Sequence, residues 1–427
     1  MKLKKWLALG LTLAMAGSVL SLVACGDEED KPGPTPTPPV DEIIDDSDQA
    51  TEGLEYTEVY ENGKFVGYSV GIGTAFEEEY IYVPAIWEGE RVVSVGVEPS
   101  TYLKLMQEAD FDNLEAEDKI AFMQKYAITY SNTLTSIHLP DSLKYFGYAA
   151  FMVCPALQEI AIPKNVTEIN DYTFYHDISL SKVTFATDAK LDYIGAWAFY
   201  NCISLSKIYL PDSLNDIDMY AFAMSGDYNV YELYGLSDID LGTGVSSIGE
   251  GAFYRCGLTS VSIPDSVADI GEKTFSECAF LKSANIGSGV RVIPNEMFYG
   301  CGQLTTVRMT GARKIEEKVF VGCEALTAVN FGEHLESVGF SAFFGCSSLA
   351  KVVLPDSIQT IANAAFQACR ALEEVTLGAN IWDIGQYAFD KGNGVLPGKI
   401  YYNGTEAEYA HVGGAGKPMA PLVTFLK

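Results

Sequence analysis

Basic residues are scarce in this sequence, and their scarcity argues against one class of partner. The chain has 28 Lys and Arg against 57 Asp and Glu, a formal net charge of −29 at pH 7. A surface of this sign repels phosphate backbones, so we expect no nucleic-acid binding. Cysteine is also sparse. Nine Cys in 427 residues are far too few for a disulfide scaffold.

Motifs of common catalytic and metal sites are missing. The sequence holds no H-E-x-x-H, G-x-S-x-G or Walker loop, and no C-x-x-C pair. Its four histidines fall at different places in the pattern described below and do not converge. A chance pair of carboxylates at glycosidase spacing stays open. We predict a protein without catalytic residues, cofactor or metal.

Apolar and aromatic residues, in contrast, are plentiful. The chain is 48% hydrophobic and contains 25 Tyr and 22 Phe. This content is too high for a disordered chain, although the net charge alone is typical of one. We therefore expect a folded protein with a large core.

The N-terminus has the pattern of an export signal. Three lysines among the first five residues precede an apolar or small run from Trp6 to Ala24. The end of this run, Leu-Val-Ala-Cys-Gly, resembles a bacterial lipobox. The resemblance implies that residues 1–24 are removed and that a lipid on Cys25 anchors the protein to a membrane. Plain secretion and an uncleaved membrane helix are the alternatives.

Residues 25–54 read as a tether. They combine an acidic run, a proline-rich segment and further acidic residues. Prolines stiffen a chain and like charges extend it, so this segment would hold the folded part away from the membrane. A merely solvated tail is the alternative.

A repeat of about 23 residues dominates the rest of the chain. Its marker is a phenylalanine that follows a small residue or Met, at spacings of 22 to 25 residues with one exception of 31. A cysteine stands three residues after most markers, and a leucine stands six residues after most. The markers are Phe151, Phe174, Phe199, Phe222, Phe253, Phe275, Phe298, Phe320, Phe343, Phe366 and Phe389.

Each repeat also carries a short alternating segment, which predicts a strand with one buried face. Pro-Asp-Ser often follows and turns the chain away. One such unit cannot bury its apolar face alone, but stacked units form a continuous core. We count thirteen strand positions, from Ile81 to Ile400, and expect them to pair in parallel. A Ser or Asn in the turn is expected to satisfy backbone groups.

The unit A-F-x-x-C-x-x-L-x-x-V-x-L-P-x-S resembles the BspA-like leucine-rich repeats of bacterial surface proteins. The resemblance implies a leucine-rich-repeat solenoid, with short parallel strands on one face and loops and short turns on the other. It also implies a surface-displayed binding or adhesion role. The boundaries we predict are an opening unit at 55–96, a helical insertion at 97–130, the repeat array at 131–391, and a closing unit and tail at 392–427.

The helical insertion has one predicted helix. Apolar residues from Leu114 to Ala127 follow helical spacing, and acidic residues come early, where the helix dipole favours them. The helix is expected to cap the apolar end of the stack. A docking element is the alternative.

Eight of the nine cysteines occupy one position of the repeat. Their Cβ vectors would run parallel from coil to coil, which favours a column of buried free thiols. Occasional disulfides and a metal site remain alternatives.

Candidate binding residues come from two regions. Residues between the buried strand positions point outward, and this slot contains Tyr209, Asp240 and Arg308. The 31-residue spacing leaves an extra loop with Tyr228, Tyr231 and Tyr234, side chains suited to recognition. A solvated sheet face, and tyrosines packed back onto the coil, are the respective alternatives.

Two functions fit these observations. The first is a monomeric, exported protein held at the cell membrane or outer surface, which binds a host or matrix protein or a glycan without catalysis. The second is an envelope scaffold that organises other bacterial proteins. An enzyme is the least favoured.

Overall fold

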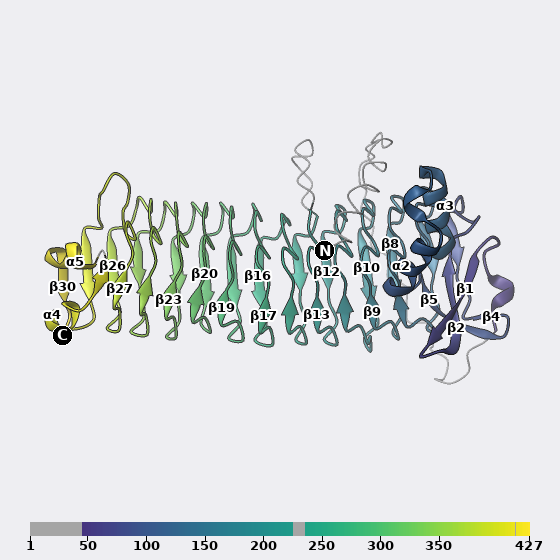
Figure 1. Ribbon diagram of the computed structural model, residues 1–427, viewed down its shortest axis with the longest axis horizontal. Helices are drawn as coiled ribbons and strands as arrows, with labels where there is room; N and C mark the ends of the chain where they lie inside the picture. The colour runs from purple at the N-terminus through teal and green to yellow at the C-terminus, as the bar shows by residue number, and fades with distance from the viewer. Residues whose placement is uncertain (1–44, 225–234, 415) are drawn as a thin grey trace, which may run out of the picture.

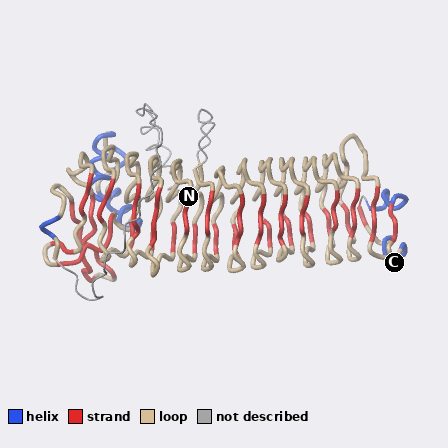
Figure 2. The backbone as a smooth tube through the Cα atoms, turned by 180° about the vertical axis from the view of Figure 1, so that it is seen from behind, coloured by secondary structure: helices blue, strands red, loops and turns tan. Residues whose placement is uncertain are grey.

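The repeat folds into one straight rod of stacked coils, one coil for each repeat (Figures 1 and 2). We describe a computed structural model, for residues 45–224, 235–414 and 416–427. The coils pack through a continuous hydrophobic core that runs from the first strands to the C-terminal elements. The chain is therefore a solenoid, as the spacing of the phenylalanines predicts, and of the leucine-rich-repeat kind that the resemblance implies.

The first set of strands, the long-strand ladder, has a strand of three or four residues in each coil. All thirteen predicted positions form strands, and β30 adds one more at the C-terminal end. Neighbours that pair are parallel, with the buried Ile and Val positions side by side. The strands are β3 (Tyr80–Tyr82), β6 (Ser136–His138), β8 (Glu159–Ile162), β10 (Lys182–Phe185), β12 (Lys207–Tyr209), β14 (Asp238–Asp240), β16 (Ser260–Ile263), β18 (Ser283–Ile286), β20 (Thr306–Met309), β22 (Ala328–Asn330), β24 (Lys351–Val353), β26 (Glu374–Leu377), β28 (Lys399–Tyr402) and β30 (Val423–Phe425).

A second set, the short-strand ladder, corrects the expectation that the other face holds only loops and turns. Most of its strands have two residues, the second usually a buried Ile or Val that contacts the same core. They are β5 (Glu90–Val95), β7 (Tyr145–Phe146), β9 (Glu168–Ile169), β11 (Tyr193–Ile194), β13 (Asp216–Ile217), β15 (Ser247–Ile248), β17 (Asp269–Ile270), β19 (Val292–Ile293), β21 (Lys314–Ile315), β23 (Ser337–Val338), β25 (Thr360–Ile361), β27 (Asp383–Ile384) and β29 (Gly413–Gly414). Two residues are too few to show alternation in the sequence.

The marker phenylalanines form one continuous stack. Consecutive rings from Phe151 to Phe389 lie 4.7 to 5.7 Å apart, and their planes differ by at most 22°. The stack continues across the longest repeat, where Phe222 and Phe253 are 5.4 Å apart. The extra residues of that repeat therefore leave the core undisturbed.

The cysteines of the repeat form a second column beside the rings. All eight are buried free thiols. Each Sγ lies 3.1 to 3.4 Å from a main-chain oxygen of the preceding coil, to which it donates a weak hydrogen bond. The acceptor is a marker phenylalanine for seven of them and Ile128 for Cys154. Burial raises the pKa of the Cys278 thiol to about 12, so this thiol remains protonated.

Serines in the turn after the long strand link the coils. Ser213, Ser266 and Ser357 donate to main-chain oxygens of the preceding coil at 2.7, 2.7 and 2.8 Å. These bonds satisfy backbone groups that neither ladder uses, which confirms the predicted role of this position.

The N-terminal end is closed by a hairpin and two helices (Figure 1). Strands β1 (Glu55–Glu61) and β2 (Lys64–Gly71) pair antiparallel, β2 pairs in parallel with β5, and β4 (Ile86–Trp87) pairs antiparallel with β5. The predicted helix is present as α3 (Ala116–Tyr126).

A further helix, α2 (Pro99–Glu108), corrects the expectation of a single helix in this insertion. Its single buried residue is Tyr102, so it lacks the apolar stripe that would have revealed it. The Tyr102 ring stacks 4.9 Å from Tyr148 of the first coils. This packing onto the end of the stack favours a cap over a free docking element. The remaining N-terminal elements are the 3-10 turns η1 (Ser47–Gln49) and η2 (Phe111–Asn113).

Short elements close the C-terminal end. They are α4 (Glu406–Tyr409), α5 (Gly416–Met419) and η3 (Ala420–Leu422), followed by β30. Thr405 and Glu408 form a capping box at the start of α4. Tyr402 and Tyr409 pack edge to face at 5.1 Å and cover the last coil.

Candidate binding face

The outward side of the long-strand ladder, here the long-strand face, presents two side chains from most strands. Because successive residues of a strand point to opposite sides, the two exposed positions of each strand flank one buried residue. The second outward position runs along the rod as His138, Ala161, Thr184, Tyr209, Asp240, Ser262, Asn285, Arg308, Asn330, Val353 and Thr376, all exposed except Thr376, which is half-buried. The three outward residues predicted from the sequence, Tyr209, Asp240 and Arg308, are all exposed on this face.

Towards both ends, charges on this face neutralise one another between neighbouring coils. Lys182 pairs with Glu159 at 2.9 Å, Lys207 with Asp238 at 2.9 Å, and Lys351 with Glu374 at 2.6 Å. The hydrogen bond from Lys351 lowers the pKa of the Glu374 carboxyl. Exposed pairs of this kind add little stability, but they leave neither partner free for a ligand.

A shallow concavity of about 430 Å³ brings Tyr209 and Asp240 together. The Tyr209 side chain is 58% exposed, and the Lys207 ammonium lies 4.8 Å from its ring centroid. Hydrogen bonds to Tyr209 and then to Asp238 raise the pKa of Lys207. This concavity combines an aromatic ring with carboxylates, a lining that suits a polar or cationic ligand group.

A larger concavity of about 570 Å³ lies over β16, β18, β20 and β22. Its outward lining consists of small side chains, polar except for Ala328, and one arginine, Arg308. Asn285 donates to Ser262 at 3.3 Å, and Asn330 accepts from the Gly332 amide at 3.0 Å. Arg308 forms no ion pair with any residue in the described ranges.

The row of residues two positions before each marker phenylalanine, here the turn ridge, offers a contrasting surface. Every described residue in this row has a left-handed backbone, including Trp197 at φ 54° and Lys273 at φ 57°. This conformation is unfavourable for residues with a side chain, but the sharp turn at the marker requires it in each coil. Such repetition identifies it as a property of the fold.

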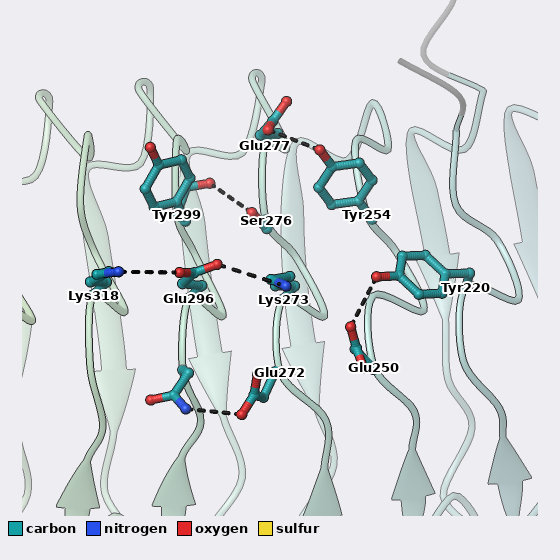
Figure 3. A network of polar contacts seen from close by, with 11 residues as sticks. Tyr220, Glu250, Tyr254, Glu272, Lys273, Ser276, Glu277, Glu296, Tyr299 and Lys318 are labelled. Carbon is teal, nitrogen blue, oxygen red and sulfur yellow. Dashed lines mark hydrogen bonds and ion pairs between the residues drawn. The ribbon is translucent and has the colours of Figure 1, made fainter. Parts of the chain in front are cut away.

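Polar groups on and beside the turn ridge are already paired with one another (Figure 3). Tyr220 donates to Glu250 at 3.0 Å, and Glu296 lies 4.0 Å from Lys273 and 3.8 Å from Lys318. Burial, with the Glu250 hydrogen bond second, raises the pKa of Tyr220 to about 12. Because a partner would have to break these contacts, the turn ridge is the weaker candidate for binding.

Sequence reasoning missed one unusual side chain inside the rod. Asp177 occupies the position of the cysteine column and is fully buried. Its Oδ1 accepts from the Cys154 amide at 2.7 Å, whereas its Oδ2 has no hydrogen-bond partner. Burial raises the pKa of this carboxyl well above its ordinary value. The replacement of Cys by Asp three residues after Phe174 was the available signal.

The other predicted site residues lie outside the described ranges. Cys25 precedes residue 45, and Tyr228, Tyr231 and Tyr234 belong to 225–234. Within the described ranges, no group of His, Cys, Asp and Glu could hold a metal ion. The same ranges contain no helix that is long and apolar enough to span a bilayer.

Comparisons with known proteins point to one family. Six copies of the BspA type leucine rich repeat region match residues 104–229, 226–312 and 291–395. A leucine-rich repeat protein from Bacteroides ovatus is 23% identical, with a TM-score of 0.59 over 91% of this chain and all of the other.

A leucine rich cell surface protein from Faecalibacterium prausnitzii is 21% identical, with a TM-score of 0.41 over 85% of this chain and 96% of the other. A search of curated proteins found no match.

Proposed function

Because the chain belongs to the BspA-type leucine-rich-repeat family, we propose that it is a surface-displayed binding protein that recognises other proteins through its long-strand face. Catalysis is not part of this function. The lipobox at Cys25, the tether and the rod would together hold this face away from the cell envelope. A protein ligand from a host or matrix is the partner class we favour.

The proposal rests on one difference between the two surfaces, namely whether their polar side chains are already bound to one another. The polar groups of the turn ridge shown in Figure 3 are bound to one another. The middle of the long-strand face instead offers small side chains over a concavity, together with Arg308, which forms no ion pair with another described residue. Small, rigidly spaced groups on an extended surface suit a macromolecular partner, since solenoids bind along such surfaces.

Bulky residues in the concavity over β16, β18, β20 and β22 should weaken binding. We expect Ser262→Trp with Asn285→Trp to weaken partner binding at least about tenfold, because two indoles would fill the space that a partner must enter. Bacteria that display the full chain would be tested with purified, fluorescently labelled matrix proteins, one at a time. Gln386→Trp, an exposed substitution beside the turn ridge, is the matched control.

The result separates the two surfaces. Binding that survives the double substitution and fails in Gln386→Trp would transfer the function to the turn ridge. Protease treatment of whole cells provides a parallel check on display, because an envelope scaffold facing the periplasm would be protected. Equal surface amounts of each variant, measured with an epitope tag, are required.

The lipid anchor has its own test. Replacing Cys25 with alanine should move most of the protein from the membrane fraction to the medium. The reason is that two or three acyl chains would supply the affinity for the bilayer, and the variant cannot receive them. Quantitative blotting of the two fractions measures the shift. Continued membrane association of Cys25→Ala would show that another element anchors the chain.

A further inference from the structure

Arg308 differs from the paired cations of the long-strand face. Lys182, Lys207 and Lys351 each contact a carboxylate of a neighbouring coil within 2.9 Å. Arg308 has no such partner among the described residues, because the positions in register with it on β18 and β22 are Asn285 and Asn330. Its guanidinium is therefore available to a ligand.

The surroundings of Arg308 favour recognition by this one side chain. The neighbouring strands contribute Ser, Ala, Val and Asn to the lining of the concavity. These side chains are too short to cover an arginine, and none of them is charged. A guanidinium presents a planar set of donors that matches both oxygens of a carboxylate. The neighbouring amides can donate further hydrogen bonds to the same group.

The charge of the whole chain limits which carboxylate can approach. With a net charge of −29, the protein repels polyanions and attracts basic surfaces. Sulfated or phosphorylated chains carry many negative charges, of which one arginine can pair with only one or two while the acidic protein repels the rest. They are therefore disfavoured as ligands. The lining of the concavity also contains no aromatic ring on which a sugar could stack. These two facts favour a protein partner.

We propose that Arg308 anchors a single acidic side chain presented by a protein whose surrounding surface is neutral or basic. This inference rests on the proposed function, since it names the group recognised on the long-strand face. The acidic body attracts the partner, and the Arg308 ion pair fixes the register of the bound chain.

Two peptides test the inference. Both are fluorescently labelled and fifteen residues long. Lys, Ser and Gly surround a central residue, which is Glu in one peptide and Gln in the other. Their affinities for the detergent-solubilised full chain would be measured by fluorescence anisotropy at low salt. General attraction to an acidic protein favours the Gln peptide, which is more positive. We expect the opposite order, with the Glu peptide about fivefold tighter.

Variants assign the preference to one residue. Arg308→Gln should reverse or abolish it, whereas Lys318→Gln, which removes a cation from the turn ridge, should retain it. A wild-type protein that prefers the Gln peptide or binds both equally would overturn the inference, as would a Glu preference that survives Arg308→Gln. Binding of a sulfated polysaccharide that depends on Arg308 would also overturn it, in favour of a polyanion.

The outcome is separable from that of the proposed function. Suppose that the displayed Arg308→Gln variant binds a matrix protein as well as wild type does, while the Ser262→Trp, Asn285→Trp double variant does not. The long-strand face is then the binding face, and the proposal that Arg308 anchors a carboxylate is wrong. If the double variant leaves matrix-protein binding intact, the proposed function fails whatever the peptides show.

Discussion

Replacing Phe320 with alanine should lower the free energy of unfolding by about 3 to 5 kcal/mol. The ring is fully buried and stacks between Phe298 at 5.5 Å and Phe343 at 4.7 Å. Hydrogen bonds in the short-strand ladder hold the adjacent coils in register on both sides. The coils therefore cannot close around the cavity, and nearly the full cost of the lost contacts should appear.

Denaturant-induced unfolding followed by circular dichroism measures this loss. Phe344→Ala is the matched control, because this phenylalanine is 39% exposed and lies outside the stack. We expect the control to change the free energy of unfolding by less than about 1 kcal/mol. Similar losses in the two variants would contradict a stack of rings as the main source of stability. A second transition in Phe320→Ala would indicate that the two halves of the rod have lost their coupling.

Replacing Asp177 with cysteine should raise the free energy of unfolding at pH 7 by about 2 kcal/mol. The substitution removes a buried carboxyl whose Oδ2 has no partner. It also restores the residue that occupies this position in the neighbouring coils, with Cys154 and Cys202 on either side. By analogy with Cys202, which donates to Phe174, the new thiol would donate to the main-chain oxygen of Phe151.

The gain should depend on pH in a defined direction. Burial raises the pKa of Asp177 in the folded protein well above 3.8, so the folded state keeps a proton that the unfolded chain releases. Below the ordinary pKa of a carboxyl, both states are protonated and this proton costs the fold no stability. As pH rises above that value towards the folded pKa, wild type loses free energy of unfolding. The advantage of Asp177→Cys over wild type should therefore be larger at pH 7 than at pH 4.

Unfolding curves of both proteins at the two pH values provide the measurement. Asp188→Asn removes an exposed carboxyl and should leave the free energy of unfolding within about 0.5 kcal/mol at either pH. An advantage for Asp177→Cys that is equal at both pH values, or greater at pH 4, would mean that Asp177 is ionised inside the rod.

The phenylalanine spacing was sufficient to predict the core of the fold. It located the stack from Phe151 to Phe389 even across the 31-residue interval. The short-strand ladder could not be recognised, because strands such as Val292–Ile293 have only two residues. The left-handed positions of the turn ridge were also hidden. Apart from Gly251, they hold residues with a side chain, such as Trp, Tyr, Lys and Glu, rather than the glycine that normally marks such a conformation.

The outward residues of the face were predictable from alternation alone, and Tyr209, Asp240 and Arg308 lie where alternation places them. Whether their charged groups are paired was not predictable. Whether a cation is paired depends on which residue the next coil brings into register, as with Lys207 and Asp238. The two concavities depend on the sizes of side chains from several coils at once, and this information is spread over widely separated parts of the sequence.

The structure of the full chain bound to a matrix protein identified on displaying cells tests the central claim most directly. We expect the partner to contact the outward residues of β16, β18, β20 and β22, with an acidic side chain at Arg308. A partner seated on the turn ridge or on an end of the rod, with Ser262 and Asn285 open to solvent, would contradict the claim that this protein binds through its long-strand face.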